Sequence, residues 1–304
     1  MVKRLLDVNL TDIKNMTKEE KLKSIKMSEG RIMASEIITL APPMLYDVSN
    51  IELAAAFGAD ILILNTYDVD NPKIYGIGEG EGLISKVKNM TGRLIAVNME
   101  PVSSEVDMVE EKINISKGRQ GRVENIEKLV KDNCDMVVLT GNPATGVTND
   151  EIIKSIENIS KKYKDEIIIC AGKMHSSGDI SEVGENIFSV EVADKFIKAG
   201  CDIVLIPAPG TIPGFTMEEC KKIIDYVHKK GKMVLTAIGT SQEGSDTQTI
   251  RQIALMSKMA GADIHHIGDC GLCMGMATPE NIMDYSIVIK GKRHTYRRMA
   301  RSIK

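Results

Sequence analysis

Lys173 and His175 are the residues whose types and spacing most suggest catalysis. They follow the apolar run Ile167–Ala171, which we predict to be a β-strand, and residues two apart on an extended strand share a face. A lysine at the mouth of a folded site is partly desolvated, which favours a role as base or imine-forming amine. Histidine titrates near neutrality and suits proton transfer. The alternative is that Lys173 only neutralises a buried carboxylate.

Glu100 and Asp68 are candidate catalytic acids or bases because they follow neighbouring predicted strands, so that their carboxylates could converge. They could orient Lys173, act as a general base, or hold Mg²⁺ or another divalent cation together with water and substrate oxygens. The sequence therefore predicts a tentative metal site at Asp68 and Glu100. Ordinary solvation of two loop carboxylates is the alternative.

Polar residues and glycines also stand at the ends of the other predicted strands. Glycine lets the backbone approach an anion, and hydroxyl groups add hydrogen-bond donors, as in the phosphate sites of many barrels. The acids Glu243 and Asp269 oppose such a site, and simple turn glycines are the alternative. Eight residues are expected to contact the substrate or its phosphate: Asn65, Asn98, Asn142, Gly239, Thr240, Ser241, Gly268 and Asp269.

The neighbouring residues His265 and His266 must face opposite ways on a strand. One should point toward the interior of the fold and the other toward the surrounding helices, and the sequence does not decide which. Just beyond them, Cys270 and Cys273 form a CxxC pair. One such pair cannot complete the four ligands of a structural zinc site, so we expect neither metal binding nor redox chemistry there.

The elements that would position these residues alternate between short apolar runs and longer amphipathic stretches. Near-continuous apolarity is typical of parallel strands covered on both faces, and parallel strands require crossover helices. Helix starts are marked by capping-box spacings, as at Ser49 and Thr216. Eight runs are predicted to be strands: Glu36–Leu40, Asp60–Asn65, Leu94–Asn98, Met136–Thr140, Ile167–Ala171, Ile203–Pro207, Met233–Ile238 and Ile264–Gly268.

An internal repeat indicates how these strands are organised. The motif AFGAD-ILIL recurs as KDNCD-MVVL, KAGCD-IVLI and MAGAD-IHHI, each with an aspartate opening an even-numbered strand: Asp60, Asp135, Asp202 and Asp263. Such quarter-barrel repetition predicts an α/β fold, a single parallel (β/α)₈ TIM barrel spanning residues 1–304, with its site in the loops after the strands. An open doubly wound sheet is the rival.

The two ends of the chain are expected to lie outside the βα repeats. Residues 1–35 predict an N-terminal helical extension that closes the bottom of the barrel or packs on its side. Residues 290–304 carry seven Lys or Arg and no acid, and predict a basic C-terminal tail. A solvated tail is the first interpretation, and a subunit or anion contact is the alternative.

The composition of the chain indicates which classes of binding partner and which location to expect. A net charge of -3, the absence of Trp and 4% aromatic residues argue against nucleic acid. No apolar stretch is long enough to span a membrane, the start lacks the pattern of a signal peptide, and six scattered cysteines are typical of reduced thiols, so we expect a cytoplasmic protein. A homo-oligomer is compatible with these features.

Several long phrases carry a family resemblance: TGNPATGVTN, AGKMHSSG, PAPGTIPG, AIGTSQEGSDTQTIRQIALMSKMAGADIHHIGD and GKRHTYRRMA. Together they resemble an uncharacterised bacterial TIM-barrel family of about this length, labelled phosphoenolpyruvate phosphonomutase-like or haloacid dehalogenase-like hydrolase. The resemblance implies the barrel fold and brings no established reaction. The phosphonomutase acid-rich strand end and Lys/Cys loop are not visible. Asp68-Val-Asp70 matches the Asp-x-Asp sequence of the hydrolase nucleophile motif. It follows the second predicted strand of a barrel, however, and not an early strand of a Rossmann-like fold.

The combined expectation is a lyase, isomerase or aldolase acting on a small phosphorylated or carboxylated metabolite. Lys173 and His175 would move protons or form an imine, while Glu100 and Asp68 would orient them or hold the cation. A metal-dependent hydrolase on the same rim is the second hypothesis. A non-catalytic binding or assembly barrel is the third.

Overall fold

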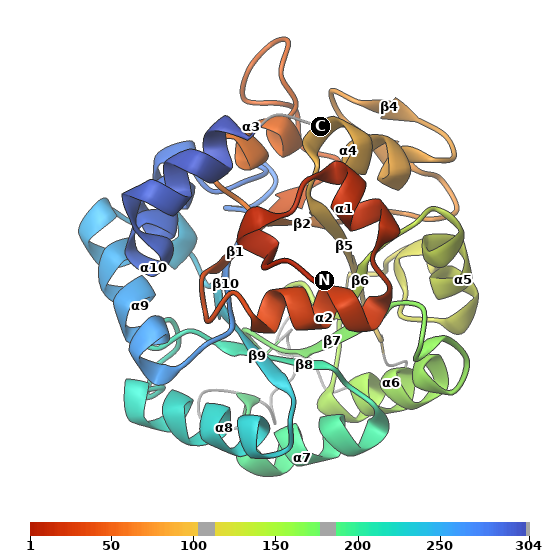
Figure 1. Cartoon of the computed structure of the whole chain (residues 1–304). Coiled ribbons are helices and arrows are strands. Elements are labelled where there is room, and N and C mark those ends of the chain that lie inside the picture. The colour runs from red at the N-terminus through yellow and green to blue at the C-terminus, as the bar shows by residue number, and fades with distance from the viewer. Residues whose placement is uncertain (103–112, 177–186, 302–304) are drawn as a thin grey trace.

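A computed structural model describes residues 1–102, 113–176 and 187–301 of the chain (Figure 1). Eight parallel strands close into a barrel in the order β1-β10-β9-β8-β7-β6-β5-β2, which confirms the predicted TIM barrel. The strands are β1 (Ile32–Ile38), β2 (Ile61–Asn65), β5 (Leu94–Met99), β6 (Met136–Leu139), β7 (Ile168–Gly172), β8 (Ile203–Pro207), β9 (Met233–Ile238) and β10 (Ile264–Ile267). A short hairpin of β3 (Lys73–Ile74) and β4 (Gly78–Glu79) follows β2.

Helices surround the barrel, and the predicted capping boxes at Ser49 and Thr216 are both formed. The outer helices are α3 (Asn50–Ala56), α4 (Leu83–Thr91), α5 (Val123–Lys131), α6 (Asn149–Tyr163), α7 (Val190–Ala199), α8 (Met217–Lys229), α9 (Thr247–Ala260) and α10 (Pro279–Ala300). Short 3₁₀ turns are η1 (Leu5–Asp7), η2 (Lys117–Arg119) and η4 (Gln242–Gly244). In the described residues no helix combines the length and hydropathy of a membrane span.

The first strand begins four residues earlier than the sequence predicted. All seven residues of β1 are buried, and Ile32 pairs with Ile264 while Ala34 pairs with Ile61. The stretch Met33–Ser35 lacks β-branched residues, so its low β-propensity gave no sign of a strand in the sequence. It is extended because it is buried between β10 and β2. Glu36 therefore lies near the carboxyl end of β1.

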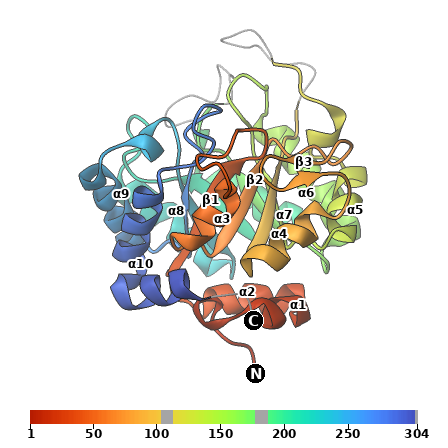
Figure 2. The same cartoon turned by 90° about the horizontal axis from the view of Figure 1, so that it is seen from above.

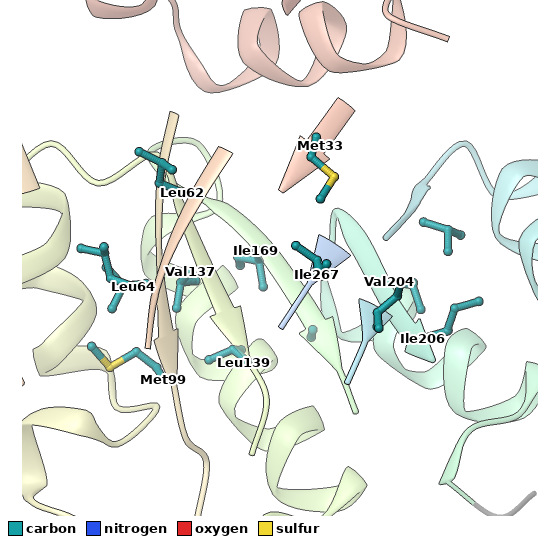
Figure 3. Packing of buried hydrophobic residues seen from close by; sticks show 14 of the residues in the cluster. Met33, Leu62, Leu64, Met99, Val137, Leu139, Ile169, Val204, Ile206 and Ile267 are labelled. Atoms are coloured by element: carbon teal, nitrogen blue, oxygen red, sulfur yellow. The ribbon is translucent and has the colours of Figure 1, made fainter. Parts of the chain in front are cut away.

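Alternation along the strands separates two apolar layers. Figure 3 shows part of the outer layer, between strands and helices, to which Met33 and Ile267 belong. The inner layer fills the barrel and includes Ala34 and Ile264. By the same alternation, Glu36 and His266 face the interior, whereas His265 faces the helices. The ring of His265 packs edge-on against Tyr285 with ring centroids 5.6 Å apart, which answers the question that the sequence left open.

The four repeat aspartates perform one structural task at the bottom of the barrel. Each carboxylate accepts a hydrogen bond from a backbone N–H of the barrel strand that comes before it in the sequence, at 2.8–3.0 Å. The four pairs are Asp60 with Met33, Asp135 with Ile95, Asp202 with Ile169 and Asp263 with Val234. Each also has a basic partner, such as Lys18 for Asp202 at 2.7 Å. The repeat seen in the sequence thus joins strands in pairs, a quarter of the barrel at a time.

The N-terminal segment closes the bottom of the barrel. Helices α1 (Leu10–Asn15) and α2 (Lys18–Lys26) cross its end, and Figure 2 shows both below the strands. Apolar side chains from this segment, among them Leu5, Ile13 and Ile25, complete the inner layer. Of the two placements that the sequence allowed for residues 1–35, the structure has the first, with the last residues of that range already in β1.

The C-terminal basic segment does not form a solvated tail, so that prediction is wrong for its described residues. Residues 290–300 continue α10, which bends at Gly291 and lies beside the N-terminal helices (Figure 2). Lys290 and Arg298 are buried and bind opposite oxygens of Asp60, at 2.5 and 2.8 Å. These cations are drawn inward because Asp60 is itself fully buried, and a buried charge requires a partner.

Candidate functional site

A cavity of about 720 Å³ lies at the carboxyl ends of the strands, within the size range of small-molecule sites. Its lining comes from the ends of β1, β2 and β5 and from the loops after β2, β6, β7, β9 and β10. The polar side chains that line it are Glu36, Asn65, Thr66, Asn98, Thr140, Asn142, His175, Ser176, Thr240, Ser241, Glu243 and Asp269.

Glu36 is the centre of the cavity floor. Its Oε1 accepts a hydrogen bond from the amide of Asn98, and its Oε2 lies 3.1 Å from Nε2 of His266. All three side chains point inward because they occupy the interior positions of β1, β5 and β10. The other ring nitrogen of His266 and the hydroxyl of Thr140 are buried without a hydrogen-bond partner among the described residues. The floor therefore retains unused hydrogen-bonding capacity.

Asp269 forms one wall with two asparagines. Its Oδ2 accepts a hydrogen bond from Asn65 Nδ2 at 2.8 Å, and its Oδ1 accepts one from the backbone N–H of Gly271 at 2.9 Å. The amides of Asn65 and Asn142 bind each other reciprocally at 2.9 and 3.1 Å. Burial, followed by the nearby Glu36 carboxylate, raises the pKa of Asp269 to about 6. Asp269 can therefore exchange a proton near neutral pH.

Glu243 enters from the turn after β9. Its side chain is buried, and its Oε2 has no hydrogen-bond partner within the described chain. Burial raises its pKa, with a contribution from Glu36. A side-chain carbon at Gly268 would come within 3.0 Å of the Ile238 carbonyl oxygen and 3.5 Å of Glu243 Cγ. A side chain at position 268 would therefore crowd the carbonyl oxygen of Ile238, whereas its contact with Glu243 would be an ordinary one.

The predicted pair Lys173 and His175 is separated in the structure. The chain turns at the end of β7, where Gly172 has a φ of 157° and a side-chain carbon would meet the Leu205 carbonyl oxygen at 1.8 Å. His175 then lines the cavity, whereas Lys173 is buried outside the lining and donates to the carbonyls of Val147 and Ser176, both at 2.9 Å. The rule that alternate residues share a face applies only while the strand continues.

Burial, with Lys173 adding to its effect, lowers the pKa of His175 to about 4. The imidazole is therefore neutral at neutral pH. A neutral imidazole can donate one hydrogen bond and accept another. The half-buried position of His175 on the cavity wall makes it suitable for contact with a substrate oxygen.

Glu100 and Asp68 lie outside the lining of the cavity. Glu100 binds Arg119 at 2.6 Å and accepts the backbone N–H of Asn142 at 3.0 Å. Asp68 accepts the backbone N–H groups of its own loop, including that of Asp70 at 2.8 Å. Glu100 thus holds the loop of Asn142, and the two acids do not form the predicted cation site. Across the described residues, no group of three or more His, Cys, Asp or Glu side chains could hold a metal.

Backbone strain also concentrates around the cavity. In the described part of the chain, seven residues other than glycine have a positive φ, and five of them line the cavity: Thr66, Ala144, Thr240, Ser241 and Cys270. Each such residue costs about 1–3 kcal/mol and persists where the surroundings impose it, which is common at functional sites. The turns that carry the predicted Thr240 and Ser241 therefore have a conformation fixed by their surroundings.

The cavity is acidic. Glu36, Glu243 and Asp269 line it, and its described lining contains no Lys or Arg. Like charges in a poorly hydrated space repel one another, in agreement with the raised pKa of Asp269. An anionic substrate would therefore depend on backbone N–H groups and hydroxyls for its negative charge.

Fold and site define a TIM-barrel protein with an acidic cavity at the usual catalytic face. Residues 6–304 match the family described as domain of unknown function DUF7916, and the chain belongs to this family. No curated protein matches the sequence.

Two similar solved structures share the barrel. One is 2,3-dimethylmalate lyase, a member of the PEP mutase/isocitrate lyase superfamily, with 12% identity over 83% of this chain and 81% of that chain and a TM-score of 0.50. The other is thiamine phosphate pyrophosphorylase from Pyrococcus furiosus, with 13% identity over 87% and 98% and a TM-score of 0.49. At these identities the likeness concerns the fold alone.

Three residues of the site were absent from the predicted set: Glu36, Glu243 and His266. Glu36 was missed because the strand was placed four residues too late, which made this acid its first residue. The usable signal was an acidic residue inside an apolar run, since a buried charge is costly unless it has a partner or a function. For His266, the signal was its two-residue spacing from Gly268 on the predicted strand.

Proposed function

We propose that this protein is an acid–base enzyme of the isomerase or lyase type, acting on a small polar metabolite in the cavity above Glu36. The observation that carries the proposal is the convergence of three carboxylates and His175 in one cavity, where His266 binds Glu36 and where burial and Glu36 raise the pKa of Asp269 to about 6. Groups whose environments move their acidity toward the working pH are typical of general acids and bases.

The contacts support a division of roles. Asp269, ionised above pH 6 and held by Asn65 and Gly271, would accept the proton from the substrate. Protonated Asp269, whose pKa of about 6 allows exchange near neutral pH, would then return a proton to another atom of the substrate. A proton thus leaves one carbon or oxygen of the substrate and another position gains one, and Asp269 ends each turnover ionised.

The histidines would bind the reacting oxygen atoms. Neutral His175 can donate a hydrogen bond to a carbonyl oxygen without becoming charged, which stabilises negative charge as it develops. His266 is oriented by Glu36 through one ring nitrogen, and its second nitrogen is buried without a partner among the described residues. We assign the Glu36–His266 pair to orienting the substrate at the floor.

The charge of the lining bears on the substrate class. The sequence favoured a phosphorylated or carboxylated metabolite, but three carboxylates and no Lys or Arg line the described cavity. The groups that could bind negative charge at the turn after β9 are the backbone and hydroxyls of Thr240 and Ser241. We therefore favour a polyhydroxylated or carbonyl compound without strong negative charge over an anionic one.

The same contacts weigh against the other mechanisms. An imine mechanism needs a lysine amine in the cavity, whereas Lys173 donates to two backbone carbonyls behind its wall. A metal-dependent hydrolase needs a cation, and both oxygens of Glu100 already have partners.

Solvent exchange tests the proposal without a known substrate. A protein-free extract of cellular metabolites is incubated with the enzyme in D₂O and analysed by mass spectrometry. We expect deuterium incorporation, or conversion with a gain of deuterium, in a small number of polar compounds. Asp269→Asn should abolish this, while Asp225→Asn, which alters an exposed acid on α8, should retain it. Exchange that persists in Asp269→Asn, or no exchange with the parent protein, would refute the proposal.

A further inference from the structure

We propose that the substrate carries a protonated amino group, and that the cavity holds this ammonium between Glu243 and Asp269 above Glu36. The inference rests on the proposed function for the location of the site and adds the chemical class of the ligand. Its basis is geometric: three carboxylates line one cavity, and the described lining supplies no Lys or Arg to balance them.

The partners of the three acids are known from the structure. Glu36 is bound by the Asn98 amide and by His266, and Asp269 by the Asn65 amide and a backbone N–H. Amide and backbone donors are neutral. They satisfy lone pairs but leave the negative charge uncompensated. The described lining adds no Lys or Arg to balance the three acids.

Thr140 gives an independent indication that a polar ligand occupies this space. Thr140 follows directly after β6 and lines the cavity, its side chain is 2% exposed, and its hydroxyl has no hydrogen-bond partner among the described residues. A buried hydroxyl without a partner is unfavourable by about 1–3 kcal/mol. Glu243 Oε2 is in the same situation. A ligand with several N–H and O–H donors would satisfy both, since an ammonium group offers three donors and no acceptor.

The way these acids are neutralised differs from that elsewhere in the protein. At the bottom of the barrel, the buried Asp60 and Asp135 each bind basic side chains, Lys290 and Lys88 among them. At the top, no Lys or Arg of the described chain pairs with Glu36, Glu243 or Asp269. A ligand can supply that missing cation. A divalent metal is a weaker candidate because no suitable ligand group exists in the described residues.

Proton linkage follows from this arrangement. Without ligand, the acids reduce their repulsion by retaining protons, in agreement with the raised pKa of Asp269. An ammonium favours the ionised carboxylates, so its binding should release protons into the solvent near pH 6. The affinity for an amine should therefore rise as the pH increases from 5 to 7.5, whereas that for a neutral isostere should not.

Matched ligand pairs test the inference directly. We would measure binding by titration calorimetry for ethanolamine against ethylene glycol, and for 2-amino-1,3-propanediol against glycerol, at pH 7.5 and pH 5. The amine of each pair should bind at least about tenfold more tightly at pH 7.5, which corresponds to about 1.4 kcal/mol. The preference should shrink at pH 5. In two buffers of different ionisation enthalpy, the heats should reveal proton release.

Variants locate the charge selectivity. Glu243→Gln should reduce amine binding about tenfold while leaving the neutral partner unchanged, and Glu157→Gln, on the exposed face of α6, should change neither. Thr140→Val, which keeps the shape of the side chain, provides a second and uncharged variant, and it should weaken both members of a pair. Circular dichroism and thermal unfolding confirm that each variant is folded before it is titrated.

The outcomes separate this inference from the proposed function. Equal binding of amine and isostere, tighter binding of the isostere, or no detectable binding of either at millimolar concentration would overturn the ammonium site. So would an amine preference that survives Glu243→Gln and Asp269→Asn together. Deuterium exchange into neutral compounds with no amine preference would leave the enzyme proposal standing alone. Amine selectivity without any deuterium exchange would leave the ammonium site standing and refute the enzyme proposal.

Discussion

Replacement of Asp269 by asparagine should make the unliganded protein more stable at neutral pH while abolishing the proposed activity. Asparagine has the same shape and no charge. It removes a carboxyl group whose ionisation is disfavoured by burial and by Glu36. These two effects raise the pKa of Asp269 from its ordinary value of 3.8 to about 6. A functional carboxylate held in an unfavourable environment reduces stability, and its removal should restore part of it.

The size of this change in the free energy of unfolding follows from the raised pKa of Asp269. A tenfold change in acidity corresponds to about 1.4 kcal/mol, so the altered pKa disfavours the ionised form by about 3 kcal/mol above pH 6. Asp269 is partly exposed, and solvent screening reduces this to about 2 kcal/mol. Asparagine has one acceptor oxygen for two donors, from Asn65 and Gly271, which loses about 1 kcal/mol. A net gain of about 1 kcal/mol remains at pH 7.5.

The sign of the pH dependence makes the prediction specific. A carboxyl group whose pKa is raised in the folded state contributes stability that is present below about pH 4 and lost as the pH rises through 6. The advantage of Asp269→Asn should therefore be near zero at pH 4 and develop between pH 4 and 6. Urea unfolding of both proteins at several pH values measures this.

Asp225→Asn is the matched control. Asp225 pairs with Lys221 on the exposed face of α8, and the hydrogen bond from that lysine lowers its pKa. This variant should gain no stability as the pH rises. If Asp269→Asn proved less stable than the parent at pH 7.5, or if its advantage were the same at pH 4, the account of the cavity as a cluster of opposed charges would be wrong.

Three further outcomes are expected. Asp60→Asn should lower the free energy of unfolding by about 3–5 kcal/mol in urea titrations, because it leaves buried cations without a partner; an effect as small as that of Asp225→Asn would contradict the buried cluster. Glu36→Gln should lower the pKa of Asp269, seen as a shift of its carboxyl NMR titration to lower pH. In NMR titrations His175 should remain neutral from pH 5 to 8, with its pKa at about 4; a midpoint near 6.5 would show that the residue is solvated.

The barrel could be predicted because its signals are local and repeated. Buried parallel strands are apolar throughout, and the motif ending in an aspartate marks the second strand of each quarter. The structure explains the repeat: the aspartate lies directly before the strand, where it accepts the backbone N–H of the neighbouring strand, as Asp135 does from Ile95 at 2.8 Å. A local geometric requirement of this kind leaves a regular trace in the sequence.

The site could be predicted only in part because it depends on the positions of strand ends. Eight predicted contacts came from the rule that catalytic groups follow strands, and these residues do lie along the cavity. Glu36 and Lys173 show the limit. Misplacing β1 by four residues removed Glu36 from the site, and continuing β7 beyond Gly172 placed Lys173 within it. A shift of one residue reverses the direction of a side chain, so boundaries matter more for the site than for the fold.

The contrast between the two ends of the barrel is the strongest reason to regard the acidic cavity as functional. The chain has 39 basic residues for 42 acidic ones, and it matches the buried acids at the bottom with cations: Lys290 and Arg298 at Asp60, Lys88 and Lys21 at Asp135, and Lys18 at Asp202. A sequence that neutralises its structural carboxylates so consistently has the means to neutralise Glu36, Glu243 and Asp269 as well. Because an uncompensated buried charge lowers stability, the buried Glu36 and Glu243 and the half-buried Asp269 in one cavity support the proposal that a ligand uses their charge.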